Sequence, residues 1–422
     1  MKDQRSISVI GLGRVGLPLA LSFADRGAHV LGVDHDRAVL EAIRAGRMPW
    51  TEAGTQELLD RVAATGRLQL AERAADAAAA DDIVITLGTP SFDHFESDLR
   101  QVRAAVDDLM PLLRPGHSLI LRSTIAPGTT EFVAGYVEKR RGLKVGEDIF
   151  VAHAPERIAA GRFLEEIGTL PCIVGGVGER SGERVGRLFE VFGAPIVQTT
   201  PVQAELAKIW TNILRYTHFA LPNLLMMDCE QYGANVFEVI DLINRDYPRG
   251  GIAQPGLTAG SCLRKDFAFS EERSHAPGML LAVSRVNESV PQFLVEGIKR
   301  RIGDDLSGRK VAVLGLSFKR DTDDERDSLS HKLIRLLERE LADVAVHDPR
   351  VPTPTQPFGE AVLDAEVVVI ATNHSDFQRP GTLQAIADST ASDCLIVDPW
   401  NCLGAAQVFA YAPEVAALTA AK

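Results

Sequence analysis

The chain has 422 residues, of which 45% are hydrophobic and 24% are charged, values that are ordinary for a globular protein. This length allows about two or three domains with cores of their own. The net charge of −12 disfavours a general nucleic-acid-binding protein, which needs a basic surface. The five cysteines are scattered and form neither a disulfide framework nor a CxxC metal pair, so we expect a reducing compartment and no bound metal.

The N-terminus runs directly into a short apolar strand and a glycine loop. It has neither the apolar region of a signal peptide nor the run of about 18 apolar residues that a membrane span needs. We therefore expect a soluble, cytoplasmic protein with no membrane partner.

The first 34 residues predict a dinucleotide-binding unit. An apolar run at 7–10 precedes GLGRVG at 11–16, and an Ala/Leu-rich helical segment then leads to AHVLGVD, which ends at Asp34. This order of strand, glycine turn, helix, strand and acid is typical of a Rossmann βαβ unit. The alternative is a glycine turn that serves packing only.

Each residue of that turn has an expected role. Gly11 permits the tight turn, Gly13 lets a pyrophosphate approach the backbone, and Gly16 allows the helix to pack closely on the strand. We also count Val15, in the same turn, among the cofactor-binding residues. Asp34 lies where a carboxylate binds a ribose 2′-hydroxyl and repels a 2′-phosphate, so we expect NAD rather than NADP.

Further apolar runs alternate with helical stretches and end near residues 87, 124, 153 and 176. This alternation predicts a doubly wound parallel sheet, whose ligands bind beyond the carboxyl ends of the strands. The site candidates that follow such strand ends are Thr89, Thr124, Glu156 and Arg157. For each threonine, the alternative is a turn residue or a helix cap.

From about 200 to 300 the pattern becomes helical, with Pro222 as an expected kink or break. Lys208 and Asn212 are four residues apart and therefore share a helix face. A helical lysine is ordinarily a solvated charge, but the neighbours of this one are largely apolar. A second helical segment covers 277–302. We interpret this central part as a spacer between two α/β lobes and as a candidate dimerisation surface.

Between these helices lies PGLTAGSCLRKDF at 255–267, which places Cys262 behind small residues and ahead of Lys265 and Asp266. Glycine lets a backbone approach a ligand closely, and cationic neighbours shift a thiol toward thiolate. The alternative is a buried structural cysteine.

A second α/β unit begins at RKVAVLGLSFK, residues 309–319. Its first turn reads GLSFK where a dinucleotide site would show GxGxxG, which predicts another ligand. Lys319 and the charged run after it are candidates to meet phosphates, or they form a solvated loop. The expected fold is therefore α/β, with two Rossmann-like doubly wound domains, 1–198 and 303–422, joined by a long central helical domain, 199–302.

Seven motifs occur together in a characteristic order and spacing: GLGRVGLPLA, GTP, STIAPGTT, APER, AELAKIWTN, GSCLRKD and GLSFKRDTDDERDS. In the order and spacing of these motifs, nearly the whole chain resembles the UDP-glucose/GDP-mannose dehydrogenase family. The resemblance implies an NAD domain, a helical spine for homodimerisation and a C-terminal domain that binds the nucleotide sugar. It also implies NAD-dependent, four-electron oxidation of a sugar C6 alcohol to a carboxylate, a reaction that serves polysaccharide biosynthesis.

The resemblance also implies roles for single residues in the reaction. Cys262 would be the nucleophile that passes through a thiohemiacetal and a thioester. Lys208 and Asn212 would stabilise the charge on the C6 oxygen. Asp266 would position lysine or water with Thr124, and Glu156 would act as the base in thioester hydrolysis.

Other matches concern the ligands. Lys319 resembles a substrate-contacting lysine, Arg326 a cofactor-facing arginine, and Arg249 an arginine sent into the partner subunit's sugar site. The full expected substrate set is Glu156, Arg157, Lys208, Asn212, Arg249, Gly260 and Lys319. Beside the glycine turn and Asp34, the expected cofactor set includes Thr89, Thr124 and Arg326.

The sequence signals for the sugar point in different directions. The segment before Cys262 departs from many relatives, with Ala259 in place of a glycine and one residue fewer after Pro255. Gly161 after APER and the run PRGGIAQPG favour UDP-N-acetylhexosamines such as UDP-ManNAc or UDP-GlcNAc. GSCLRKD is closer to the UDP-glucose and GDP-mannose branches. We place UDP-glucose marginally first because it is the commonest substrate of the family.

Two further hypotheses assign the protein to other functional classes. One is a catalytically inactive nucleotide-sugar-binding protein, which would lack at least one of the residues assigned to catalysis. The other is a two-electron dehydrogenase of the 2-hydroxy-acid or 6-phosphogluconate type, which has no use for a cysteine nucleophile or a second Rossmann-like lobe.

Overall fold

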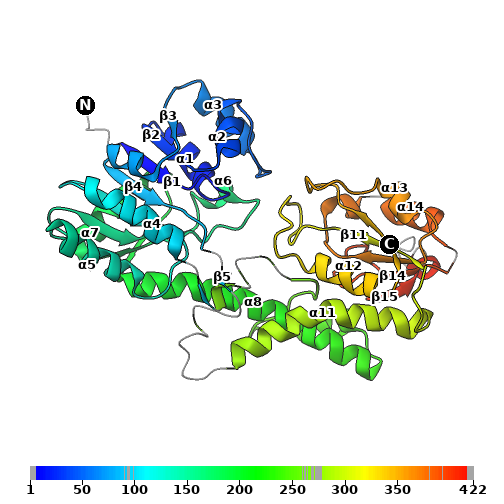
Figure 1. The fold of residues 1–422 in the computed structure, drawn as a ribbon. Coiled ribbons are helices and arrows are strands. Elements are labelled where there is room, and N and C mark those ends of the chain that lie inside the picture. The colour runs from blue at the N-terminus through cyan, green and yellow to red at the C-terminus, as the bar shows by residue number, and fades with distance from the viewer. Residues whose placement is uncertain are drawn as a thin grey trace. The chain divides into compact units, whose positions relative to one another are not determined.

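The structure is a computed structural model that describes residues 6–89, 91–92, 96–97, 99–258, 260, 263, 265–267, 270, 278–379, 381–391 and 393–415. Its packing divides the chain into two compact units, Met1–Asn212 with Lys265–Arg273 and Ile213–Arg264 with Ser274–Lys422. The long helix α8 (Pro201–Tyr232) contributes residues to both units (Figure 1). The three-domain division that we expect from the sequence stays a prediction.

The first unit is built on a sheet that has eight strands within the described residues, in the order β10-β9-β8-β7-β4-β1-β2-β3. The strands from β8 to β3 run parallel in the Rossmann order. The pair of β9 and β10 extends the sheet, and β9 runs antiparallel to β8, a reversal that the sequence did not predict. The strands are β1 (Ile7–Ile10), β2 (Val30–Val33), β3 (Leu68–Ala71), β4 (Asp82–Ile85), β7 (Ser118–Leu121), β8 (Phe150–His153), β9 (Cys172–Gly176) and β10 (Ile196–Thr199).

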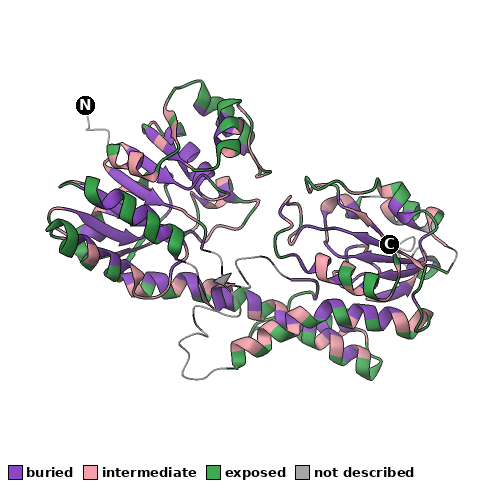
Figure 2. Cartoon of the chain, in the orientation of Figure 1, coloured by how far each residue is buried: buried purple, intermediate pink, exposed green. Residues whose placement is uncertain are grey.

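Helices cover both faces of this sheet, so its central strands are buried and read as continuous apolar runs (Figure 2). Val9 and Val84 pack on the face covered by α1 and α7, and Ile10 and Ile85 on the face covered by α4 and α5. A small ribbon of β5 (Ser91–Phe92) and β6 (Glu96–Ser97) lies outside the sheet. The helical segments are α1 (Gly16–Asp25), α2 (Arg37–Arg44), α3 (Thr55–Ala63), η1 (Ala74–Ala79), α4 (Arg100–Leu109), η3 (Met110–Leu112), α5 (Thr129–Arg141), α6 (Phe163–Glu166), α7 (Glu179–Phe189) and η4 (Glu190–Phe192).

The second unit holds a smaller sheet in the order β12-β11-β13-β14-β15, parallel except for the antiparallel strand β15. Side chains alternate across it with the period of two expected of strands. Val311 and Val313 face α11 and α12, and Ala312 and Leu314 face the opposite side, where Phe377 and other residues after β13 pack. The strands are β11 (Lys310–Leu314), β12 (Asp343–His347), β13 (Val367–Ile370), β14 (Leu395–Val397) and β15 (Phe409–Tyr411).

The remaining helices of this unit are α9 (Val236–Asn244), α11 (Met279–Ile302), α12 (Leu329–Arg339), α13 (Phe358–Val362), η5 (Ser375–Gln378) and α14 (Thr382–Ser389). The break that Pro222 suggested does not occur, since α8 continues through it to Tyr232. In the part of the chain that the structure describes, every helix is too short or too polar to cross a membrane.

A buried chain of amides ties α8, α11 and the segment that leads toward Cys262. Asn287 Nδ2 donates to the Tyr216 carbonyl oxygen at 3.2 Å, and Asn223 Nδ2 donates to Asn287 Oδ1 at 2.9 Å. The backbone N–H of Gly256 donates to Asn223 Oδ1 at 2.8 Å. Both asparagines are fully buried, so each lost contact would leave a polar group without water.

We expect Asn223→Ala to destabilise the protein by about 1–3 kcal/mol, because the Gly256 N–H and Asn287 Oδ1 both lose their buried partner. The measurement is the shift in urea-induced unfolding. Gln231→Ala, at an exposed position in the last turn of the same helix, is the control and should stay within about 0.5 kcal/mol of the unaltered protein. Equal stability of the Asn223 variant would contradict a structural role for the amide chain.

Candidate dinucleotide and catalytic site

The glycine turn between β1 and α1 has the geometry that a phosphate-binding loop needs. Gly11 has a φ of +91°, which glycine adopts without strain. A Cβ on Gly16 would lie 1.8 Å from the Gly11 carbonyl oxygen, so only glycine fits where the helix meets the strand. A Cβ on Gly13 would meet no atom within 4 Å, which leaves open space over the backbone. Val15 immediately precedes the first residue of α1.

Asp34 follows β2 and borders this turn. Its Oδ2 accepts from the Leu12 N–H at 2.7 Å, and its Oδ1 accepts from the Asp36 N–H at 2.9 Å. The same carboxylate lines a cavity of about 500 Å³ together with Gly11. The other lining residues are Ile10, Val33, His35, Glu72, Arg73, Ala74, Ala75, Leu87, Gln101, Ala104, Ala105 and Asp108. An open glycine backbone beside a carboxylate in a cavity fits the pyrophosphate and ribose of NAD.

A second cluster joins three predicted catalytic residues. Asn212 Nδ2 donates to Asp266 Oδ2 at 2.5 Å, and the Lys208 ammonium lies 3.9 Å from the same oxygen. The side chain of Asp266 is fully buried and that of Lys208 is 11% exposed. Lys208 and Asn212 reach one carboxylate because they lie four residues apart on α8. Among the described residues, Asp266 Oδ1 has no hydrogen-bond partner.

The threonines predicted at the strand ends lie next to each other. Thr89 Oγ1 donates to the Thr124 carbonyl oxygen at 2.8 Å. The Lys265 ammonium donates to the Thr89 carbonyl oxygen at 2.8 Å and to its Oγ1 at 2.9 Å. Lys265 adjoins Asp266, so this contact places the chain next to Asp266 at the strand ends of the first unit.

Glu156 is buried and held by three nitrogen donors. Its Oε1 accepts from the Arg157 and Ile158 backbone N–H groups at 2.7 and 2.8 Å. Its Oε2 pairs with the Arg122 guanidinium. Burial opposes the Arg122 charge, but the Glu156 carboxylate outweighs burial and raises the pKa of Arg122. Arg122 was missed from the sequence, where its only signal is its place directly before STIAPGTT.

Two further buried groups were also missed. His153 Nδ1 donates to the Leu121 carbonyl oxygen at 2.8 Å. The Nε2 atom of the same ring has no hydrogen-bond partner among the described residues. Burial lowers the pKa of His153 to about 3, and the charges of Arg122 and Lys208 act in the same direction, so the ring is neutral. This ring lies at the end of β8, directly before the APER motif.

Glu205, one turn before Lys208 on α8, supports the STIAPGTT loop. Its carboxylate accepts from the Gly128 N–H at 2.6 Å, the Thr130 N–H at 2.8 Å and the Thr130 hydroxyl at 2.6 Å. These are the free donors at the N-terminus of α5. Burial raises the pKa of Glu205. It lies inside the motif AELAKIWTN, which is the signal that could have indicated it.

Several predicted residues belong to the second unit. Gly260, with a φ of +105°, packs so closely on Phe318 that a Cβ would lie 2.6 Å from the ring. Arg326 is paired with Asp324 through two contacts of 2.8 and 2.6 Å. Arg249 is exposed and stacks 4.9 Å over the Tyr247 ring. Cys262 and Ala259 lie outside the described residues, so their roles stay predictions.

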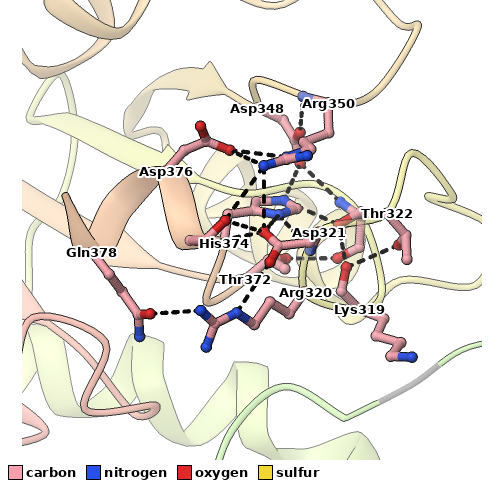
Figure 3. A network of polar contacts seen from close by, with 12 residues as sticks. Lys319, Arg320, Asp321, Thr322, Asp348, Arg350, Thr372, His374, Asp376 and Gln378 are labelled. Carbon is pink, nitrogen blue, oxygen red and sulfur yellow. Dashed lines mark hydrogen bonds and ion pairs between the residues drawn. The ribbon is translucent and has the colours of Figure 1, made fainter. Parts of the chain in front are cut away.

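The first turn of the second sheet repeats the arrangement of the first. Asp348 follows β12, and its Oδ2 accepts from the Leu316 N–H at 2.6 Å, directly after Gly315 with its φ of +103°. Here the carboxylate is fully buried and contacts His374 (Figure 3). Burial alone would raise the pKa of Asp348, but His374 and the backbone N–H groups outweigh it and lower the pKa to about 2. The Asp348 carboxylate therefore makes its hydrogen bonds within the fold and is not available to bind a ribose.

Family models match the chain in three consecutive parts. They describe the UDP-glucose/GDP-mannose dehydrogenase family: its NAD binding domain at residues 5–193, its central domain at 202–289 and its UDP binding domain at 312–405.

Relatives and solved structures agree over nearly the whole chain. A UDP-N-acetyl-D-mannosamine dehydrogenase of Pyrococcus horikoshii is 33% identical over 379 residues, which cover 88% of this chain and 90% of that protein. An NDP-N-acetyl-D-galactosaminuronic acid dehydrogenase of Ralstonia nicotianae is 32% identical over 403 residues, 90% of this chain and 93% of that protein. The solved structure of a UDP-glucose dehydrogenase from Pyrobaculum islandicum matches with a TM-score of 0.83 at 31% identity, covering 94% of this chain and 95% of that one.

We expect Asp34→Asn to reduce the preference for NADH over NADPH by about tenfold, which corresponds to about 1.4 kcal/mol. The asparagine oxygen still accepts from the Leu12 N–H, but the charge that repels a 2′-phosphate is gone. Binding of both nucleotides is measured by their fluorescence. Asp36→Asn is the control, because Asp36 only caps α2 and asparagine caps equally well. An unchanged ratio in Asp34→Asn would remove Asp34 from cofactor selection.

Proposed function

The chain belongs to the UDP-glucose/GDP-mannose dehydrogenase family, and from that premise we propose that it oxidises the C6 alcohol of a UDP-linked sugar to a carboxylate in two NAD-dependent steps. The observation that carries this proposal is the cluster of Lys208, Asn212 and Asp266 in the unit that holds the glycine turn. Each step removes a hydride from C6, and NAD is the group that accepts it.

The cluster supplies donors for the oxygen on C6. Lys208 and Asn212 both contact Asp266 Oδ2, so one buried carboxylate orients an ammonium and an amide together. Donors held this way stabilise the negative charge that develops on an alkoxide, a role worth about 3 kcal/mol for each donor. Asp266 Oδ1, which has no partner among the described residues, is an acceptor suited to a water or a substrate hydroxyl.

The second oxidation needs a nucleophile that is also a good leaving group, and we assign this role to Cys262. Its thiolate adds to the C6 aldehyde, and the thiohemiacetal loses a hydride to become a thioester. Water then attacks the thioester, which releases the thiolate and the sugar carboxylate. Glu156 is the base for this water, and the Arg122 pair with the two backbone donors keeps its carboxylate in one orientation.

For the sugar, we favour a UDP-N-acetylhexosamine over the UDP-glucose that we placed first from sequence. Relatives from Pyrococcus horikoshii, Campylobacter jejuni and Ralstonia nicotianae, at 32–33% identity, are named for 2-acetamido sugars. The matching structure of a UDP-glucose dehydrogenase keeps UDP-glucose as the competing substrate. The UDP part rests on the match of residues 312–405 to the UDP binding domain.

The two hypotheses of other functional classes, an inactive binding protein and a two-electron dehydrogenase, receive less support. An inactive binding protein would not need Lys208, Asn212 and Asp266 gathered around one buried carboxylate oxygen. A dehydrogenase of the 2-hydroxy-acid type would not need a second sheet with its own strand-end turn.

We expect two NADH for each sugar consumed, and faster turnover with UDP-ManNAc or UDP-GlcNAc than with UDP-glucose or GDP-mannose. Absorbance of NADH against a limiting amount of sugar measures both. Cys262→Ser should reduce turnover by about 100-fold or more, because a hydroxyl replaces the thiolate nucleophile. Cys229→Ser, the same exchange within α8, is the control. One NADH per sugar, or full activity in Cys262→Ser, would refute the double oxidation through this thiol.

We also propose that the protein forms a homodimer through its central helices. Large apolar side chains stay exposed along α8 at intervals of four, four and seven residues: Leu206, Trp210, Leu214 and Leu221. Trp210 is 51% exposed, and Leu242 of α9 is also exposed. A row of this kind is typical of a covered surface, and a second copy of the chain covers it in the proposed dimer.

We expect Trp210→Glu to shift the protein from dimer to monomer, because a charge in an apolar interface has no partner there. Light scattering after size-exclusion chromatography measures the mass. Phe132→Glu on α5 makes the same kind of change at an aromatic residue that is even more exposed and should leave the mass unaltered. A monomeric unaltered protein would contradict the proposal.

A further inference from the structure

A buried histidine lies at the centre of a polar network in the second unit (Figure 3). His374 follows β13 and is fully buried. It contacts residues of the loop after β11 and the acid after β12, so it joins the ends of the strands β11, β12 and β13.

The two ring nitrogens of His374 have different partners. The backbone N–H of Asp321 points at Nδ1 at 2.9 Å. Because a backbone N–H can only donate, Nδ1 is the acceptor and the proton lies on Nε2. Nε2 in turn lies 3.2 Å from Asp348 Oδ2 and 3.1 Å from Ser317 Oγ.

These contacts hold the chain on both sides of Lys319. Ser317 lies two residues before Lys319 and Asp321 two residues after it. The Lys319 carbonyl oxygen itself accepts from the Ser317 and Thr322 hydroxyls, each at 2.9 Å. The backbone around Lys319 is therefore held by the contacts of Ser317, Asp321 and Thr322. The side chain of Lys319 extends away from the network (Figure 3).

Asp321 shows that this loop is held in a costly conformation. Its φ of +57° is uncommon for a residue with a side chain and costs about 1 kcal/mol or more. Its carboxylate accepts from the Ser375 N–H and hydroxyl, both at 2.8 Å, and its N–H donates to His374. A strained turn persists where its surroundings over-determine it, and such turns gather at ligand sites.

Two of the carboxylates near the ring, those of Asp321 and Asp376, are paired with an arginine. Arg350 lies 2.6 Å from Asp376 and 3.6 Å from Asp321. Its backbone N–H also donates to Asp348 Oδ1 at 2.8 Å. The hydrogen bond from the Asp321 N–H to Nδ1 fixes the orientation of the ring among these acids, so the function of the ring here is geometric.

We propose that His374 is a positioning residue that sets Lys319 for the diphosphate of the nucleotide sugar. The proposal rests on the proposed function and on the expectation from sequence that Lys319 contacts the UDP-sugar. His374 acts through Ser317 and Asp321. Removing the ring loosens the loop, most of all at Asp321, whose N–H loses its partner. The ammonium of Lys319 then loses its preset position, and binding of the diphosphate must first order the loop.

Three variants separate the contacts of the two ring nitrogens. His374→Ala removes the contacts of both nitrogens. His374→Asn places an amide oxygen near Nδ1, where it accepts from the Asp321 N–H. His374→Gln reaches toward Nε2, where its amide can donate to Asp348 or Ser317. Asp348 and Ser317 keep other partners without the ring, but among the described contacts the Asp321 N–H does not.

We therefore expect UDP affinity, measured by calorimetry, to fall about tenfold in His374→Ala and to recover more in His374→Asn than in His374→Gln. The KM for the sugar should rise by a similar factor, and kcat at saturating sugar should change less than twofold. NADH affinity serves as the internal control and should not change. If the alanine variant does not fold, the comparison of Asn with Gln decides the proposal.

A double-mutant cycle tests whether His374 affects UDP binding by positioning Lys319. In a Lys319→Ala background, His374→Ala should cause little further loss of UDP affinity, because the group being positioned is already absent. Additive losses, a better recovery in His374→Gln, or unchanged UDP affinity in His374→Ala would each overturn the proposal. If the unaltered protein does not bind UDP while it binds NADH, the proposed function fails instead.

Discussion

One contact recurs in both sheets and sets the turn on which each ligand site depends. A carboxylate at the end of the second strand accepts the N–H of the residue that follows the first strand's glycine. Asp34 accepts from Leu12 at 2.7 Å in the first unit, and Asp348 accepts from Leu316 at 2.6 Å in the second. In each case the acid also accepts from the backbone two residues after itself. This bond holds the glycine turn at the carboxyl end of the sheet, where ligands of such folds bind.

The surroundings of that bond decide what each turn offers. In the first unit Gly13 leaves open space and Asp34 borders a cavity, so backbone and carboxylate are available to a dinucleotide. In the second unit the corresponding position is Ser317, and His374 covers Asp348. A buried acid that is already hydrogen-bonded gains nothing from a ribose. In the role that we propose, the second turn instead offers Lys319, a charge suited to a phosphate.

The helix α8 has a comparable organising role in the first unit. Glu205, Lys208 and Asn212 follow one another at intervals of three and four residues, so they lie along one face. Glu205 holds the N-terminus of α5 and the loop after β7, while Lys208 and Asn212 meet Asp266. One rigid helix therefore fixes both the loop and the donors, which suits the two successive oxidations that we propose.

Features that depend on local spacing could be predicted from the amino-acid sequence. The GLGRVG turn and Asp34 follow strand and helix periodicity, and the four-residue interval places Lys208 and Asn212 on one face. Partners that lie far away along the chain became known only from the folded structure. The Arg122–Glu156 pair joins the ends of two strands, His374 reaches back more than fifty residues, and β9 reverses its direction beside β8. Periodicity shows which face of an element a residue occupies. It does not show which distant segment packs on that face, because the spatial order of the strands in the sheet decides this.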